Sequence, residues 1–267
     1  MAKKPAKSDR RAVIDDIRKK QRGAERARGT AIIVVCVVIA LAIVGIAAFK
    51  PIKDSIQTSA YDSSLLQDIG KSPSKAGCQK IFELKADGNQ QHEPTGTQIT
   101  YTTAPPAFGP HWNEGNGVAP LSMGRKFYTR SERGTYPSGI ELEQVVHNLE
   151  HGYTVLWYDD TVKGSELSEI RGIAKKFTGT GDFRDKFIAL PWTASDAKEV
   201  YKAGKAHTSF PKGTHIALTH WSAGGPGQTD TAKQKGAFQY CAGVSGAAVK
   251  AFMEKYPYTD SPEPTTM

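Results

Sequence analysis

The chain has 267 residues, a formal net charge of +8 at pH 7 and only three cysteines. So few cysteines exclude a small disulfide-rich scaffold. Eleven lysines and arginines precede Ala31, so much of the positive charge lies in an N-terminal arm over residues 1–30. Because this arm has no aromatic residue on which bases could stack, we expect no nucleic-acid partner.

An apolar segment, Ala31–Phe49, follows the arm and has no charged residue in its 19 positions. As a helix it would be about 28 Å long, close to the ~30 Å of a bilayer core, so it predicts one transmembrane helix. A cleaved signal peptide, cut near Ala40–Ala42, is the alternative. A signal has an apolar run of only ~7–15 residues after a short charged start, so we favour an uncleaved anchor.

The basic residues also predict the orientation of the anchor. Many lysines and arginines precede the apolar segment, whereas only Lys50 and Lys53 follow it before Lys71. Positive loops stay on the cytoplasmic side. We therefore expect a single-pass protein of the cell membrane with a cytoplasmic N-terminus and an extracytoplasmic C-terminal part.

The cysteines agree with this orientation. Cys36 lies in the apolar segment, whereas Cys78 and Cys241 both lie beyond it. Two cysteines in an oxidising compartment usually pair, and a bridge closing such a long loop contributes up to ~5 kcal/mol in the chain-entropy model. We predict a Cys78–Cys241 disulfide, with two unrelated thiols as the alternative.

The rest of the chain divides into a Ser/Asp/Lys-rich linker over residues 50–77, one domain over residues 78–257 and a Pro-rich tail over residues 258–267. Hydrophobic patterning predicts strands over residues 81–85, 98–102, 153–158, 187–192 and 214–221, and helices over residues 140–149, 165–177 and 245–256. This order predicts an α+β fold, a mixed sheet flanked by helices. It is distantly similar to a thioredoxin-like order, without the Cys-x-x-Cys pair.

Four of the seven histidines cluster in the first half of the domain, at His92, His111, His147 and His151. The last two are four positions apart and share one helix face, and His111 lies in a loop rich in Pro and Gly. A rigid loop histidine and a helical pair are a common source of three ligands for Zn²⁺ or Cu²⁺. We expect Glu150 to orient one imidazole. Purely structural hydrogen bonding is the alternative.

The string His147-Asn-Leu-Glu-His151 also fits the H-x-x-E-H motif, in which two histidines bind zinc and the glutamate activates water. This keeps a metal-dependent hydrolase with Glu150 as base as an alternative. Two features argue against the hydrolase. Gly152 ends the helix immediately after the motif, and no downstream glutamate lies in a sequence context that identifies it as a third zinc ligand.

Several stretches together resemble a largely actinobacterial family of membrane-anchored proteins with a domain of unknown function. The resemblance covers about Cys78–Pro264. Its motifs are Pro-Pro-x-x-Gly-x-His, Gly-x-Tyr and His-x-Leu-Glu-His-Gly, with an upstream His and Tyr, and they fall on His92, Tyr101, Pro105, Pro106, Gly109, His111, Gly134, Tyr136, His147, Leu149, Glu150, His151 and Gly152. Phe108 departs from the small residue usual there, and Asn116-Gly117 lacks a cysteine that many members have.

The resemblance implies no reaction, but it implies an accessory role beside an envelope or respiratory complex. Together with the histidines, it makes a membrane-anchored extracytoplasmic binding module, holding Cu or Zn, our preferred expectation. The metal-dependent hydrolase remains the alternative.

Overall fold

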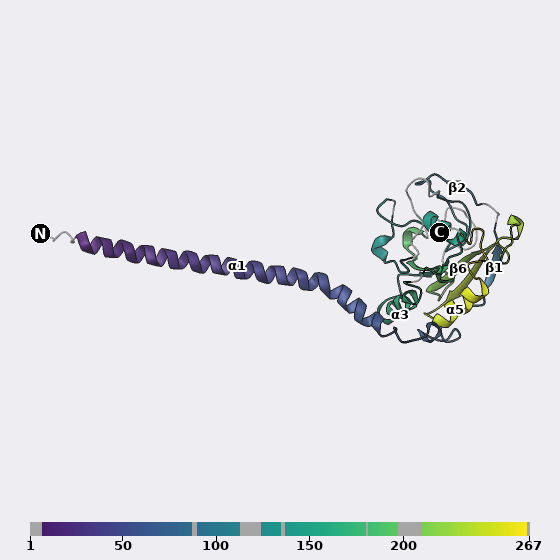
Figure 1. Cartoon of the computed structure of the whole chain (residues 1–267), viewed down its shortest axis with the longest axis horizontal. Coiled ribbons are helices and arrows are strands. Elements are labelled where there is room, and N and C mark those ends of the chain that lie inside the picture. The colour runs from purple at the N-terminus through teal and green to yellow at the C-terminus, as the bar shows by residue number, and fades with distance from the viewer. Residues whose placement is uncertain are drawn as a thin grey trace. The chain divides into compact units, whose positions relative to one another are not determined.

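The computed structural model describes residues 7–86, 90–112, 124–134, 137–179, 181–196 and 210–265. The chain divides into two compact units, Met1–Ile56 and Gln57–Met267. Helix α1, Lys7–Ser59, makes up most of the first unit and includes the predicted apolar segment (Figure 1). Among the described residues, one helical stretch, Arg11–Phe49, is long and apolar enough to cross a membrane, a test that a signal sequence also passes.

The second unit is built on a five-stranded mixed sheet in the order β1-β7-β6-β4-β5. The strands are β1 Phe82–Lys85, β4 Thr154–Tyr158, β5 Phe187–Pro191, β6 Ile216–Ser222 and β7 Lys235–Cys241. Strands β4 and β5 are parallel, and the other neighbours are antiparallel. The mixed sheet flanked by helices is therefore confirmed.

Helices cover both faces of the sheet because its strands are apolar on both sides. Val155 and Trp157 pack with α2, Leu142–Glu150, whereas Leu156 and Tyr158 pack with α3, Gly164–Lys175, and α5, Gly246–Lys255. Alternate residues of a strand point to opposite faces, so each strand serves two cores. Figure 1 shows β6 and β1 lying between β2 on one side and α3 and α5 on the other.

One predicted strand is wrong, and one strand of the five-stranded sheet was missed, as were two strands of two residues each, β2 (His92–Glu93) and β3 (His111–Trp112). Residues 98–102 form no strand, because the Ile99 amide donates to the Glu143 carboxylate at 2.9 Å instead of to a neighbouring strand. Strand β7 was missed because its sequence, KGAFQYC, has neither a clean alternation nor a continuous apolar run. The other predicted strands and helices match observed elements to within a few residues at each end.

Parts of the expected linker and tail pack on the second unit. Ile69 is 1% exposed, and Gly70 forms a β-bridge with Ser245 beside α5. At the other end, residues 258–265 form a C-terminal segment whose Asp260 is buried. The Asp260 carboxylate accepts from the Ser222 hydroxyl at 2.9 Å and from the Gly225 amide at 2.7 Å.

The predicted disulfide is present between Cys78 and Cys241. It ties the chain just before β1 to the last residue of β7, where the Gln79 amide also donates to the Tyr240 carbonyl at 2.7 Å. Cys36 is a free, exposed thiol on α1.

Candidate metal centre

Two short strands bring the first two histidines together. Strand β2, His92–Glu93, pairs with β3, His111–Trp112, in parallel register, so that His92 lies directly opposite His111. The loop before β3 is held at both ends by buried tyrosines. The Tyr101 hydroxyl donates to the Pro110 carbonyl at 2.8 Å, and the Tyr240 hydroxyl donates to the Ala104 carbonyl at 2.7 Å.

Helix α2 supplies the third histidine. Its apolar residues recur at helical spacing, and a capping box starts it, with the Gln144 side chain accepting from the Glu141 amide at 3.1 Å. His147 and Glu150 lie in its last turn, and His151 is its C-cap. Gly152 follows with a φ of +89°, the left-handed conformation that commonly ends a helix.

Backbone carbonyl groups orient two of the imidazoles. His111 Nδ1 lies 2.9 Å from the Gly109 carbonyl oxygen, and His147 Nδ1 lies 2.7 Å from the Trp112 carbonyl oxygen. A carbonyl only accepts, so each Nδ1 carries a hydrogen and each neutral ring has its lone pair on Nε2. Metal-binding histidines are commonly held in this way. These two carbonyls therefore orient the rings of His111 and His147 through Nδ1.

Glu150 instead lies against the Nε2 side of the histidines. Its side chain is fully buried, with Oε2 2.8 Å from His111 Nε2 and 3.6 Å from His92 Nε2. Its other oxygen accepts from the Gln90 amide at 3.0 Å. Burial pushes the pKa of Glu150 upward, but the close contact with His111, with help from Gln90 and His92, outweighs this and holds the pKa below its usual range. The carboxylate is therefore ionised at neutral pH.

The close approach of His111 to Glu150 calls for a cation. A neutral His111 with its hydrogen on Nδ1 would place a lone pair 2.8 Å from a carboxylate oxygen. Neither atom makes a well-directed hydrogen bond within the part of the chain that the structure describes. Two buried acceptors at this distance are stable together only if a proton or a metal ion lies with them.

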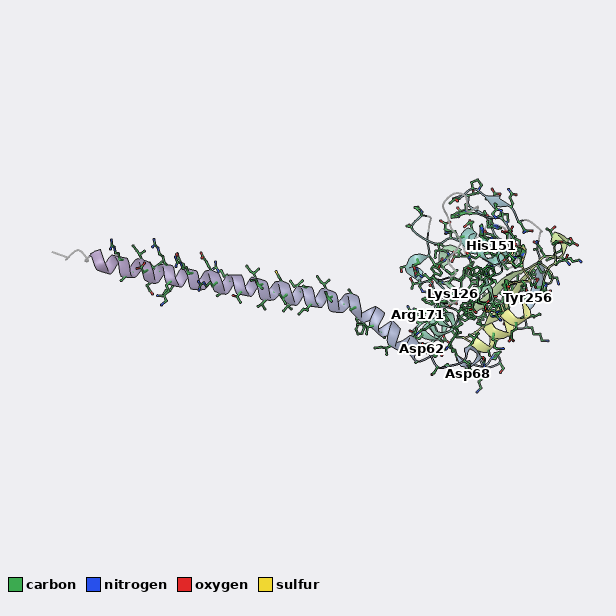
Figure 2. The ribbon with its side chains drawn as sticks, viewed as in Figure 1. Asp62, Asp68, Lys126, His151, Arg171 and Tyr256 are labelled. Carbon is green, nitrogen blue, oxygen red and sulfur yellow. A yellow bond between two sulfur atoms is a disulfide. The ribbon has the colours of Figure 1, made fainter. Side chains whose placement is uncertain are left out.

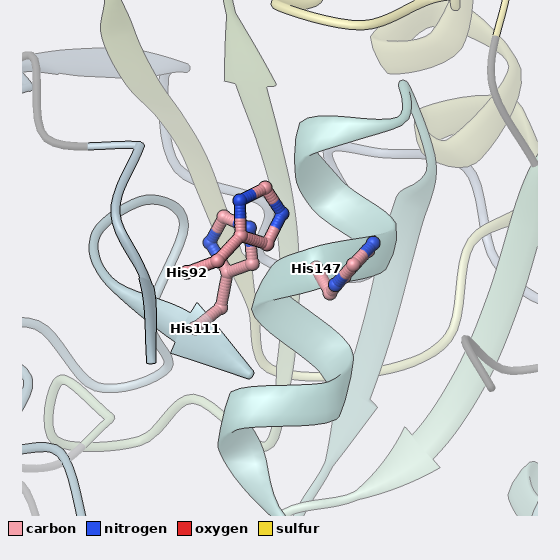
Figure 3. A group of neighbouring side chains, drawn as sticks. All are labelled: His92, His111 and His147. Atoms are coloured by element: carbon pink, nitrogen blue, oxygen red, sulfur yellow. The ribbon is translucent and has the colours of Figure 1, made fainter. Parts of the chain in front are cut away.

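Two further histidines converge on this pair. The rings of His92, His111 and His147 have centroids 4.6, 4.9 and 5.2 Å apart (Figure 3). One nitrogen from each of the three lies within 4.8 Å of the other two, and so do ligand atoms of a second group, His147, Glu150 and His151. A tetrahedral ion with bonds of about 2.0–2.1 Å separates its ligands by about 3.3 Å, so small side-chain shifts would close either group on an ion.

His151 lies at the edge of the cluster, inside the second unit (Figure 2). Its ring centroid is 4.5 Å from that of His147, and its Nε2 is 3.5 Å from the Glu263 carboxylate of the C-terminal segment. Burial and the neighbouring His147 lower the pKa of His151 to about 4. The imidazole is therefore neutral at pH 7, the form that binds metals.

Two other described histidines lie apart from this centre. His215 pairs with Asp159 on the surface at 2.9 Å. His220 is buried on the opposite sheet face, with its ring 5.9 Å from Tyr256. His207 and Tyr136 of the Gly-x-Tyr motif lie outside the described residues, as do Asn116 and Gly117.

A comparison with protein families decides the family of the chain. The model for proteins of unknown function DUF3105 matches residues 92–267. The chain belongs to the DUF3105 family. No curated protein and no solved structure matches the chain. The DUF3105 match begins at His92 and includes all four clustered histidines, Glu150 and the C-terminal segment, whereas β1, Cys78 and Gln90 precede it.

Sequence reasoning missed two participants in the centre of this DUF3105 protein. Gln90 bridges Glu150 and Gln234, donating to the first at 3.0 Å and accepting from the second at 2.8 Å. Glu263 brings a carboxylate near His151 from the far end of the chain. Neither residue stands in a recognisable metal-ligand spacing, so only the three-dimensional fold reveals them.

Proposed function

We propose that this protein is a membrane-anchored binding module that holds one Zn²⁺ or Cu²⁺ ion at His92, His111 and His147, with Glu150 as the neighbouring anion. The observation that carries this proposal is the buried contact between His111 Nε2 and Glu150 Oε2. A single proton could serve these two atoms only. An ion is favoured because His92 and His147 converge on the same point, and three imidazoles with a carboxylate suit these two metals.

Metal analysis of the full-length chain in nanodiscs tests the proposal. The protein is loaded with Zn²⁺ or Cu²⁺, dialysed and assayed for bound metal, and its affinity is measured by competition with a chelator. We expect one ion per chain, and at least ~10-fold weaker binding in His111→Ala and His147→Ala. His215→Ala is the matched control, because His215 lies apart from the centre. Equal metal content in the wild type and both variants would remove the metal function.

Two further variants decide the position of the ion. His147 belongs to both candidate groups, but His92 belongs only to the first and His151 only to the second. We expect His92→Ala to weaken binding more than His151→Ala. The reverse result would place the ion with His147, Glu150 and His151.

A metal-dependent hydrolase is the second candidate. The observation that favours it is the ionised Glu150 carboxylate among the same histidines, as a general base requires. Metal-loaded protein is assayed against a panel of peptide and ester substrates. Turnover by the wild type that is lost in Glu150→Gln while metal remains bound would favour the hydrolase, and no turnover would favour the binding module.

The location and partner of the module form part of the same proposal. The basic arm supports a cytoplasmic N-terminus, and the Cys78–Cys241 disulfide supports an extracytoplasmic domain. A place beside an envelope or respiratory membrane complex is supported by the family resemblance alone. Crosslinking in intact membranes, followed by identification of the linked proteins, tests this partner.

A further inference from the structure

Strand β1, labelled in Figure 1, forms one edge of the five-stranded sheet, and β5 forms the other. The β5 edge is covered, because the Ala189 amide donates to the Lys126 carbonyl at 2.8 Å and the Tyr128 amide donates to the Ala189 carbonyl at 3.0 Å. Strand β1 pairs with β7 on one side, and within the described residues no backbone pairs with its other side. In that part of the chain, β1 is therefore the open edge of the sheet.

The pairing of β1 with β7 shows which backbone groups face the open edge. The Ala86 amide, directly after β1, donates to the Gln234 carbonyl, directly before β7, at 3.0 Å. Alternate residues of an antiparallel strand face the same neighbour, so Leu84 also turns its N–H and C=O groups toward β7. Glu83 and Lys85 turn theirs away from β7, where an added strand could pair with them.

The two faces of β1 differ in chemistry. The side chains of Phe82 and Leu84 are partly buried and pack against the hydrophobic core. Glu83 and Lys85 are exposed on the opposite face, together with Lys235, whose ammonium lies 2.8 Å from the Glu83 carboxylate. A strand added at this edge would therefore meet apolar side chains on one face and charged side chains on the other.

Lysines predominate on the charged face. A groove of about 520 Å³ beside β1 is lined by Glu83, Lys85, Lys233 and Lys235, among others. The Glu83 carboxylate binds Lys235 and also accepts from the Tyr256 hydroxyl at 2.8 Å, so its charge is matched. Lys85 and Lys233 form no ion pair with any described residue. Lys85 also lies directly opposite Lys235 across the two strands, so their like charges repel.

The other described carboxylates near the groove already hold backbone amides. Asp230 accepts from the Ala232 amide at 3.0 Å, and the buried Asp260 accepts from the Gly225 amide at 2.7 Å. Asp87 lies outside the described residues. The charge that complements the groove is therefore negative, and it has to come from the added strand.

We infer that β1 is a docking edge for an extended acidic segment of a partner protein, which joins the sheet antiparallel to β1. Its backbone pairs with Glu83 and Lys85. Its acidic side chains lie at alternate positions, opposite Lys85 and toward Lys233, and the apolar side chains between them cover Phe82 and Leu84. A lysine on an edge strand discourages strands that do not match its charge. This site is independent of the proposed metal function.

The probe is the peptide Glu-Val-Glu-Val-Thr-Val, blocked at both ends and labelled with a fluorophore. The second glutamate is placed opposite Lys85, and threonine opposite Glu83, where a further glutamate would be repelled. Fluorescence anisotropy measures its binding to the full-length chain in nanodiscs of zwitterionic lipid, with empty nanodiscs subtracted. We expect saturable binding, and at least ~10-fold weaker binding when lysine replaces both glutamates. No saturable binding, or equal binding of the lysine peptide, would overturn the inference.

Two N-methylated peptides test the backbone pairing. Methyl groups on the second glutamate and the threonine block the N–H groups that face β1, whereas methyl groups on the first two valines block N–H groups that face away. We expect the first peptide to bind at least ~10-fold more weakly than the second, because it loses the hydrogen bonds to the strand. Equal binding of the two peptides would show that the probe does not add to the sheet.

Variants of the protein locate the site. Lys85→Gln removes the charge and keeps the outward N–H, and we expect about threefold weaker binding. Lys85→Pro removes both, and an edge strand tolerates proline where the N–H faces outward, so we expect at least ~10-fold weaker binding. Lys163→Gln is the control, because Lys163 is exposed and lies outside the groove. Unchanged binding in a Lys85→Pro protein that is folded by thermal unfolding would place the probe elsewhere.

Mass photometry without the peptide separates a partner protein from a second copy of the chain. We expect wild type and Lys85→Pro to have the same oligomeric state. A wild-type dimer that Lys85→Pro converts to a monomer would assign the edge to a second copy and overturn the inference.

Discussion

Gly152 is the residue at which α2 ends and the C-terminal segment crosses it. A β-carbon at this position would lie 2.5 Å from the Tyr258 carbonyl oxygen and 2.8 Å from the Ser261 hydroxyl. The backbone also has a φ of +89°, which L side chains rarely adopt. This glycine therefore allows the segment that carries Glu263 to lie beside His151.

We predict that Gly152→Ala destabilises the fold by more than the left-handed backbone alone requires. Gly213 is the matched control, because it has a φ of +80° and nothing within 4 Å of its added β-carbon. Gly213→Ala should cost about 1–2 kcal/mol, and Gly152→Ala clearly more, since Tyr258 must also move. Urea unfolding of both variants measures the difference. If both variants lose the same free energy of unfolding, the C-terminal segment moves away from the added β-carbon at no cost.

A second glycine explains the departure from the family pattern at Phe108. A β-carbon on Gly236 would lie 2.5 Å from the Phe108 ring, so the missing side chain in β7 makes room for the large one in the loop. The Phe108 ring also lies edge-on to Trp221, with centroids 6.4 Å apart. The two positions are therefore coupled through contact, although 128 residues separate them in the sequence.

At the scale of elements, the sequence predicts what depends on local pattern. Strands β4 and β5 are continuous apolar runs, and α2 has its apolar residues at helical spacing. The sequence therefore predicts both the strands and the helix. Residues 98–102 alternate like a strand, but tertiary contacts override the pattern, because the Ile99 amide bonds to Glu143 of α2. Local propensity cannot anticipate a partner so far along the chain.

The candidate metal centre likewise has features that the sequence predicts and features that depend on tertiary packing. Its histidines are visible in the sequence through their spacing and their loop. The pairing of β2 with β3, which sets His92 opposite His111, spans 19 residues and includes only two residues of each strand. The contacts of Glu150 with Gln90 and His111 likewise depend on how the elements pack. The sequence therefore suggests the ligands but not their arrangement.

Removal of the C-terminal segment, residues 258–265, should show how much the stability of the domain depends on packing between distant parts of the chain. We predict that truncation after Tyr258 lowers the free energy of unfolding by on the order of 3 kcal/mol or more. The loss follows because the truncation deletes the Asp260 carboxylate that holds Ser222 and Gly225, and the Glu263 amide that donates to the Glu150 carbonyl at 3.0 Å. Urea unfolding measures it.

Truncation after Thr265 is the control for this experiment, because it removes only the last two residues and keeps every contact named above. Its stability should match that of the full chain. If both truncations are equally stable, the C-terminal segment contributes nothing to the fold.

At the scale of the whole molecule, one covalent bond closes the domain. The Cys78–Cys241 disulfide has a sequence separation of 163 residues and joins the chain just before β1 to the end of β7. We predict that Cys78→Ser lowers the free energy of unfolding by about 2–5 kcal/mol, because the unfolded chain gains freedom. Cys36→Ser is the control, since Cys36 is a free thiol on α1. A reductant should destabilise the wild type and leave the unfolding of Cys78→Ser unchanged.

The orientation of the chain in the membrane is the last prediction, and it combines the basic arm with the disulfide. Eleven basic residues precede Ala31, and a disulfide persists only in an oxidising compartment, so both features favour an exported domain. A reporter that is active only outside the cytoplasm should therefore work when fused after Thr265, a site chosen because residues 258–265 pack on the domain. A tag placed at Met1 should remain on the same polypeptide, since an anchor is not cleaved. Recovery of the fusion without the tag would show that the apolar segment is a cleaved signal. Activity of a cytoplasmic reporter alone would reverse the predicted orientation and would place the two cysteines in a reducing compartment, where a disulfide does not persist.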